Sequence, residues 1–216
     1  MSSGSWRFEL LAKPYGGISE GPVWDGESIL FTHIGTSSIM RYSPESGQIS
    51  EWRGGTNHTN GLAWDSAGRL FGACSGGRAI VRFNPDGSNV VVVDRVDGQK
   101  LNTPNDLAVD RRGRIWWTNP WNAANIDSSE VEELDNRSVL MADPEVGGSY
   151  TVKRVTFDTT MPNGILVSID GETLYVAESN SDDASIDREL RAYPIRNDGS
   201  LGPYDTLHAF GTNKRE

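Results

Sequence analysis

Four polar residues recur at matching places in this 216-residue sequence, and each precedes an apolar run and a turn. They are Glu20 in SEGPVW, Asn60 in TNGLAWD, Asn105 in TPNDLAVD and Asn163 in MPNGILVS, spaced by 40, 45 and 58 residues. Carboxylate and amide oxygens that converge from rigid elements are the donors that Ca²⁺ prefers, and Mg²⁺ or Mn²⁺ bind similar donors. The pattern predicts a divalent-metal site containing Glu20, Asn105 and Asn163. The role of Asn60 is left open because TNG lacks a stiffening proline.

A second explanation exists for each asparagine taken alone. Asparagine beside glycine or after proline is a common turn residue because it tolerates left-handed backbone geometry. The shared register of Asn105 and Asn163 with the acidic Glu20 favours the metal site over this explanation. A closed zinc site is not indicated, since the three His and the single Cys are not clustered.

The elements that carry these residues repeat with them. In the second copy, GLAWD leads through DSAG to RLFGACS, then to AIVRFNP, the turn DGS and NVVVVD. This predicts four short antiparallel strands joined by hairpins, and the other copies share the same order. Four strands in each repeat of roughly 40–45 residues are typical of a β-propeller blade. We therefore predict an all-β propeller with blades at about 19–55, 58–96, 103–157 and 161–210. A β-sandwich would not explain the shared register.

The propeller geometry predicts where the site lies. The first strand of each blade is innermost, so a residue just before it lies at one mouth of the central channel. The loops after the second strands surround the same mouth, and the loop spanning 119–137 is long and acidic. It is predicted to be a lid, a specificity loop or a solvated surface insertion. We expect substrate contacts from Thr103, Asn105, Asn119 and His58, although His58 is equally explained as a surface histidine.

Composition limits the partners and the compartment. A net charge of −10 argues against a nucleic-acid partner, which needs clustered Lys and Arg. No apolar run has the length of a membrane span, and the N-terminus lacks the features of a signal peptide. The single cysteine, Cys74, excludes an internal disulfide and is predicted to be a packed thiol. We expect a cytoplasmic protein that binds neither nucleic acid nor membrane.

The quoted segments, with EGPVW and TPNDLAVDRRGRIWWTNP, resemble the regucalcin/gluconolactonase family over nearly the whole chain, from about Glu20 to Phe210. The resemblance implies a six-bladed propeller with one divalent metal in the channel, and hydrolysis of sugar lactones or similar esters. It implies that Glu20 of EGP and Asn163 of PNG bind the metal. It also implies that Asn105 of PND contacts metal or substrate. The implied metal is Ca²⁺, with Mg²⁺, Mn²⁺ and Zn²⁺ as alternatives.

Two departures from the family pattern bear on activity. The family commonly has an acidic residue where this chain has Asn119 in TNP, which leaves the substrate open. The resemblance implies a further motif, a PDG step in a fifth blade whose Asp completes the metal site and serves as the base, and the given sequence stops at HAFGTNKRE before it. The catalytic residue is therefore unassigned, and four of six expected blades are present. The remaining blades are expected from a longer chain or from another subunit, and the open blade edges predict self-association.

Two functions follow from these observations. The first is a metal-dependent lactonase, in which the cation polarises the lactone carbonyl and water attacks it. The second is a non-catalytic propeller that binds calcium or another ligand, or an inactive truncated member of the family. The fold alone does not separate them.

Overall fold

The structure is a computed structural model that describes residues 7–11, 17–179 and 188–211. Its strands form four antiparallel sheets of four strands each, which we call blades 1 to 4. Blade 1 contains β1 (Ser19–Trp24), β2 (Ile29–His33), β3 (Ser38–Ser43) and β4 (Gln48–Arg53). Blade 2 contains β5 (Thr59–Trp64), β6 (Leu70–Cys74), β7 (Ala79–Phe83) and β8 (Asn89–Val93).

Blades 3 and 4 repeat this order. Blade 3 contains β11 (Leu107–Val109), β12 (Ile115–Asn119), β13 (Ser138–Pro144) and β14 (Tyr150–Arg154). Blade 4 contains β15 (Pro162–Val167), β16 (Thr173–Glu178), β17 (Arg188–Pro194) and β18 (Asp205–Gly211). A small hairpin of β9 (Arg95–Val96) and β10 (Gln99–Lys100) links blades 2 and 3, and two 3-10 turns, η1 (Ile34–Thr36) and η2 (Ala123–Asn125), lie in loops. The predicted set of four four-stranded blades is confirmed.

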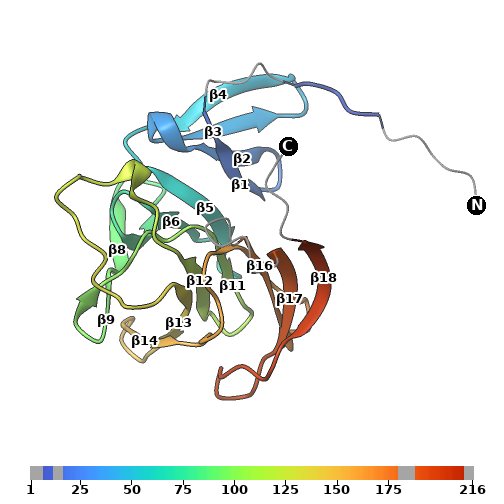
Figure 1. The fold of residues 1–216 in the computed structure, drawn as a ribbon. Helices are drawn as coiled ribbons and strands as arrows, with labels where there is room; N and C mark the ends of the chain where they lie inside the picture. The colour runs from blue at the N-terminus through green and yellow to red at the C-terminus, as the bar shows by residue number, and fades with distance from the viewer. Residues whose placement is uncertain (1–6, 12–16, 180–187, 212–216) are drawn as a thin grey trace, which may run out of the picture.

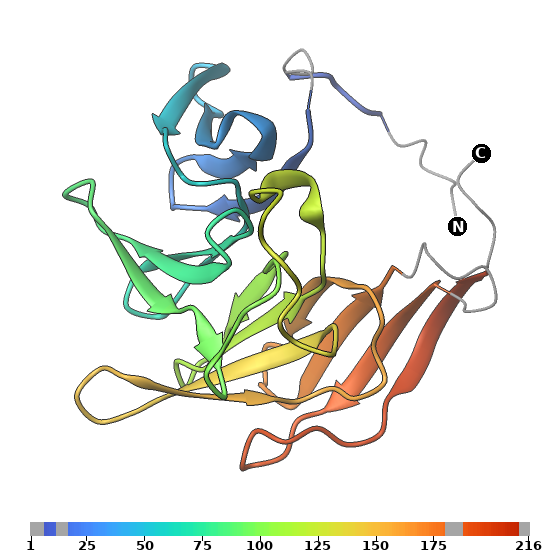
Figure 2. The ribbon, with the colours of Figure 1, turned by 60° about the vertical axis from the view of Figure 1, so that its left-hand side comes forward.

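The blades follow one another around a common axis, with the first strand of each blade innermost (Figure 1). Along the inner rim, β5 contacts both β1 and β11, and β11 contacts β15. Figure 2 shows that the arc is open between blade 1 and blade 4. No helix in the described ranges is both long enough and apolar enough to cross a membrane.

Apolar side chains fill the junctions between consecutive blades. Trp116 and Trp117 are neighbours in β12 and are both fully buried, yet they belong to different hydrophobic clusters. Alternate residues of a strand point to opposite faces of the sheet, so Trp117 packs toward blade 2 and Trp116 toward blade 4. On the other face of blade 4, Leu166 is 61% exposed whereas its neighbour Ile165 is buried. The face of blade 4 that looks away from blade 3 is therefore uncovered in this chain.

An aspartate organises the turn that follows the first strand in three of the blades. In blade 3, Asp110 accepts hydrogen bonds from the backbone N–H groups of Arg112 and Arg114 at 2.9 and 3.1 Å. Its second oxygen pairs with the Arg114 guanidinium at 2.6 Å and accepts the Trp116 indole N–H at 3.0 Å. Asp25 and Asp65 accept backbone N–H groups in the corresponding turns. These side-chain bonds replace missing backbone partners, which explains the repeated aspartate.

The four recurring polar residues lie at one end of the first strands, with one difference from the expected position. Glu20, Asn60 and Asn163 are the second residues of β1, β5 and β15, inside the strand rather than before it. The pairing register shifts directly after Glu20, and Asn60 and Asn163 lie within the corresponding shifts of β5 and β15, as in a β-bulge. A glycine follows each residue, and Gly21 adopts a positive φ of 54° that a residue with a side chain rarely adopts. Asn105 precedes β11, as expected.

Candidate functional site

A cavity of about 340 Å³ opens at the mouth of the channel, where the four inner strands meet. Side chains from all four blades line it, among them Glu20, Asn60, Asn105 and Asn163. The structure thus brings together the residues that the sequence pattern singled out, and it includes Asn60. A second cavity of about 400 Å³ continues along the channel and is lined by the first strands. Glu20 lines both cavities and lies at their junction.

The side chains of these four residues share one property. Within the described residues none of the four makes a hydrogen bond through its side chain, although their backbone groups do. An asparagine that serves only as a turn former uses its carboxamide to bond its own backbone. Here the three carboxamides line the cavity instead and make no such bond in the part of the chain that the structure describes. Polar groups that face a cavity without protein partners require water, a cation or a substrate to satisfy them.

The electrostatics of the mouth favour a cation. Burial raises the pKa of the Glu20 carboxyl above its ordinary value. Asp106, which lines the channel below, has its pKa raised to about 6. Burial is the main cause, two backbone N–H groups oppose it, and the nearby Glu20 charge contributes to the rise. Two partly desolvated carboxylates repel each other, and a bound cation relieves both the repulsion and the desolvation. Asp106 was not singled out by the sequence analysis.

The remaining predicted substrate residues occupy different surroundings. Thr103 lines the cavity, but its hydroxyl is engaged, because it donates to the Pro120 carbonyl and accepts the Asn122 N–H, both at 2.8 Å. Asn119 is fully buried, does not line the cavity, and its carboxamide has no hydrogen-bond partner among the described residues. The His58 ring lies against blade 1, with Nδ1 2.9 Å from the Ile34 carbonyl oxygen, and does not line the cavity. Their roles stay predictions.

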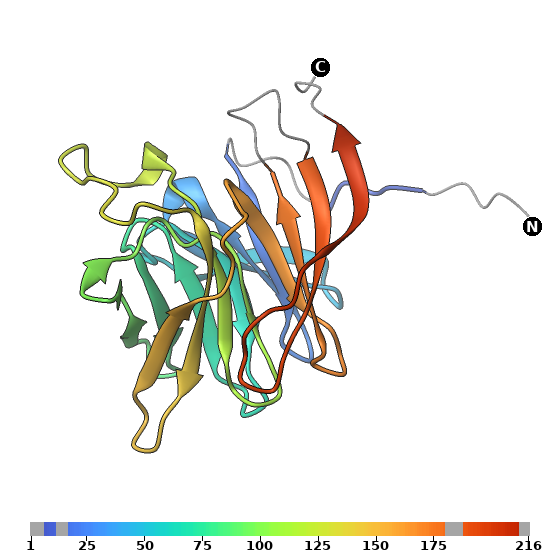
Figure 3. The ribbon, with the colours of Figure 1, turned by 60° about the horizontal axis from the view of Figure 1, so that its bottom comes forward.

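The long acidic loop between β12 and β13 projects from this end of the arc (Figure 3). Its first part, around η2, forms one wall of the cavity through Asn122 and Asn125. Its second part is fastened to the β9–β10 hairpin, where Glu130 pairs with Lys100 at 2.6 Å. Glu130 also pairs with the buried Arg78 at 2.5 Å, and these two cations hold the pKa of the Glu130 carboxyl below its ordinary value. The loop is therefore a docked wall rather than a solvated insertion.

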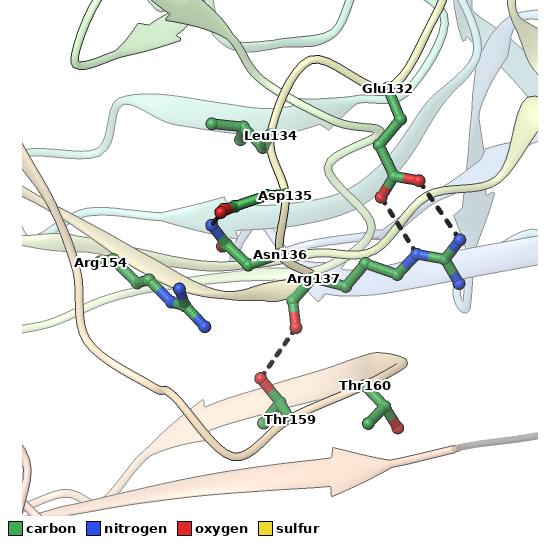
Figure 4. A pocket seen from close by; sticks show the side chains of 8 residues that line it. All are labelled: Glu132, Leu134, Asp135, Asn136, Arg137, Arg154, Thr159 and Thr160. Carbon is green, nitrogen blue, oxygen red and sulfur yellow. Dashed lines mark hydrogen bonds and ion pairs between the residues drawn. The ribbon is translucent and has the colours of Figure 1, made fainter.

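Another cavity lies outside the channel. It has a volume of about 530 Å³ and lies between the end of this loop and Thr159–Thr160 (Figure 4). Its charged groups already pair with each other, since Glu132 accepts two hydrogen bonds from Arg137 at 3.1 and 3.3 Å. The hydroxyl of Thr159 donates to the Arg137 carbonyl at 3.0 Å. Because its polar groups satisfy one another, we place the functional site at the mouth of the channel, where they do not.

Cys74 is buried at the top of β6, and burial raises the pKa of its thiol. Its Sγ lies 3.1 Å from the Asn57 carbonyl oxygen. A thiol with a raised pKa and no basic partner is a poor nucleophile, so its surroundings fit the expected packing role.

An arc of four-stranded blades with an oxygen-lined mouth defines a β-propeller of the lactonase type. The sequence profile of the SMP-30/gluconolactonase/LRE-like region matches residues 18–214, and the chain belongs to this family. A gluconolactonase from Zymomonas mobilis is 30% identical over 184 residues, which cover 77% of this chain and 50% of that protein. The chain thus spans half the length of this curated relative.

Two solved structures are also similar to this chain over most of its length. A gluconolactonase from Xanthomonas campestris is 31% identical, with a TM-score of 0.76 over 88% of this chain and 62% of that one. A calcium-binding regucalcin from Agrobacterium tumefaciens is 17% identical, with a TM-score of 0.66 over 92% of this chain and 61% of that one. The second comparison shows the shared fold alone.

Proposed function

We propose that this chain carries part of a divalent-metal-dependent lactonase that opens a neutral sugar lactone or a similar ester. The observation that carries the proposal is the set of one carboxylate and three carboxamides, drawn from four blades, that line one cavity without hydrogen bonds to the protein. The gluconolactonase relatives support the same reaction class. The location in the cytoplasm and the self-association of open blade edges stay predictions.

The residues at the mouth fit a hard cation. Glu20, Asn105 and Asn163 would supply oxygen donors, and Asn60 is a fourth candidate on the same wall. Ca²⁺ suits these donors best, and Mg²⁺, Mn²⁺ or Zn²⁺ are alternatives. No group of three or more His, Cys, Asp or Glu side chains gathers in the described ranges, so the donor set depends on amides. A cation bound there would act as a Lewis acid on the lactone carbonyl.

The chain's own residues would bind and orient the substrate. Carboxamides on the first strands and on η2 face the cavity from opposite walls, and they both donate and accept hydrogen bonds, as sugar hydroxyls do. Apolar contacts from Ile34 and Met161 limit the water in the cavity. The attacking water needs a base, and no residue of this chain is assigned to that role.

The same oxygen donors also support a second candidate function. A propeller that binds calcium or a polar ligand without catalysis needs the same oxygen donors but no base. The two functions are separated by measuring hydrolysis and binding on the same protein.

The test compares the 216-residue chain with a version extended by two further blades. We expect the extended version to hydrolyse gluconolactone, to lose that activity in EDTA and to regain it with Ca²⁺. The 216-residue chain should bind Ca²⁺ weakly and turn over slowly, because three protein donors leave most of a shell of about 6–8 ligands to water. Ca²⁺ binding by the extended version without hydrolysis would establish the binding function instead.

The charge of the cavity predicts the form of the substrate. The lining residues that the structure describes include one carboxylate and no Lys, Arg or His. A phosphate group would enter without a cationic side chain to pair with it. We expect the extended version to hydrolyse gluconolactone with kcat/KM about tenfold or more above that for its 6-phosphate. Equal values for the two lactones would contradict the assignment of this cavity.

A further inference from the structure

Blade 3 departs from the repeat directly after its site residue. A glycine follows Glu20, Asn60 and Asn163, whereas Asp106 follows Asn105. Asp106 is partly buried, and Gly61 of blade 2 packs against it so closely that a Cβ on Gly61 would clash with its carboxylate and its Cα atom. A buried carboxylate at this position costs free energy unless it makes specific bonds.

Asp106 uses its carboxylate to reach blade 4. Its Oδ1 accepts the N–H of Leu107 at 2.9 Å within blade 3. Its Oδ2 accepts the N–H of Ile165 at 3.1 Å, two residues beyond Asn163. One side chain therefore ties the start of β11 to the segment that carries Asn163.

Thr118 makes the complementary contact on the other side of Asn163. This residue of β12 is fully buried, and its hydroxyl accepts the Asp106 N–H at 3.1 Å. The same hydroxyl donates its proton to the Asn163 carbonyl oxygen at 2.6 Å. The peptide segment from Asn163 to Ile165 is thus held at both ends by two residues of blade 3. Asp106 follows Asn105 in the sequence, and the Thr118 carbonyl accepts the Asn105 N–H. We call Thr118 and Asp106 the Asn163 clamp.

The junction between blades 1 and 2 uses a threonine hydroxyl in the same way, but no carboxylate joins it in the described residues. Between blades 1 and 2, the buried Thr32 hydroxyl lies 3.1 Å from the Glu20 carbonyl oxygen and 2.8 Å from that of Asn60. Between blades 2 and 3, the Gly61 N–H donates to the Asn105 carbonyl at 2.8 Å. The junction between blades 3 and 4 combines a buried hydroxyl with a buried carboxylate, and it joins the two asparagines expected to share one cation.

We propose that Thr118 and Asp106 are positioning residues that fix the carboxamide of Asn163 relative to that of Asn105. Neither needs to touch the ligand, since both act through the backbone of the residues that do. The link to metal binding rests on the proposed function, while the clamp itself is a property of the fold. A displacement of about 1 Å between two donors is enough to weaken a site that needs both.

The first test examines the clamp without metal. Amide hydrogen exchange of Ile165 is measured by NMR in EDTA for the wild type, Thr118→Val, Thr118→Ser and Asp106→Asn. We expect exchange about five- to tenfold faster in Thr118→Val, the loss that follows from one buried hydrogen bond. Exchange should also be faster in Asp106→Asn, because an asparagine side chain has one oxygen acceptor for the two N–H groups that Asp106 binds. Thr118→Ser keeps the hydroxyl and should match the wild type.

The matched control is Thr156→Val. Thr156 is buried and its hydroxyl accepts the Val139 N–H at 2.8 Å, but it contacts neither Asn105 nor Asn163. The loss of this hydroxyl should leave the rate of amide exchange at Ile165 unchanged. Unchanged exchange in Thr118→Val, or equal acceleration in Thr118→Val and Thr156→Val, would overturn the clamp.

The second test measures Ca²⁺ affinity by calorimetry on the same variants. We expect Thr118→Val to bind Ca²⁺ about five- to tenfold more weakly, with Thr118→Ser and Thr156→Val within about twofold of the wild type. Wild-type affinity in a Thr118→Val protein with faster Ile165 exchange would show that the clamp does not serve the cation. A wild type that binds no Ca²⁺ would refute the proposed metal site and leave the exchange result to decide the clamp.

Discussion

Replacing Glu20 by glutamine is expected to lower the affinity for Ca²⁺ about a hundredfold and to remove EDTA-sensitive lactone hydrolysis. Glu20 is the one carboxylate among the described residues that line the mouth cavity, so the substitution removes the charged donor and keeps the shape. A neutral amide retains an oxygen but loses the charge that offsets the desolvation of the cation. Calorimetry with Ca²⁺ and a lactonase assay on the same preparation measure both effects.

Glu27→Gln is the control for the change in charge. Glu27 is exposed in the turn after β1, at the other end of the same blade, and it donates a hydrogen bond to Asp25 through its backbone N–H. This variant should match the wild type in both assays. A Glu20→Gln protein that still binds Ca²⁺ as tightly as Glu27→Gln would remove Glu20 from the site.

Replacing Gly61 by alanine is expected to destabilise the fold by about 3 kcal/mol, at the upper end of the usual cost of overpacking. The added methyl group would lie 2.7 Å from the Cα atom of Asp106 and 3.0 Å from the Asn105 carbonyl oxygen, and closer still to the Asp106 carboxylate. Backbone atoms on the inner rim cannot move without disturbing the neighbouring blade. Urea unfolding followed by tryptophan fluorescence measures the loss in the free energy of unfolding.

Gly164→Ala is the matched control, since Gly164 follows Asn163 as Gly61 follows Asn60. An alanine methyl group there would meet only the Cβ of Ala177 at 3.7 Å, an ordinary van der Waals contact. We expect a change below about 1 kcal/mol. Equal destabilisation by the two substitutions would mean that the close approach of blades 2 and 3 at Gly61 does not constrain the fold.

The repeat predicted the fold well because each blade carries its own local signals. A strand, an aspartate turn and a second strand recur with regular spacing, and Asp110 shows how directly the turn residue organises its turn. The β9–β10 hairpin was not predicted, since it belongs to no repeat. The positions of Glu20, Asn60 and Asn163 inside their strands were also not predicted, because bulges depend on local pairing between strands.

The sequence predicted the residues that line the cavity, but it did not predict the residues that hold them in place. Asn105 and Asn163 stood out by register, whereas Thr118 bonds a backbone carbonyl in another blade, 45 residues away. Any residue type has a backbone carbonyl, so no sequence pattern reveals such a partner. Asp106 left one signal, the replacement of the glycine found in the other three copies. The engagement of His58 and Thr103 by neighbouring loops depends on tertiary contacts that the pattern does not contain.

The docking of the β12–β13 loop makes one wall of the cavity sensitive to ionic strength. The pair between Lys100 and Glu130 is partly exposed, so dissolved salt screens it, whereas the pair formed by the enclosed Arg78 is screened much less. In 1 M salt the Debye length is about 3 Å, so the pair between Lys100 and Glu130 should weaken while the pair between Arg78 and Glu130 persists. We expect the loop to stay docked through Arg78, so that the wall that carries Asn125 is the part of the cavity whose shape responds to the surrounding electrolyte.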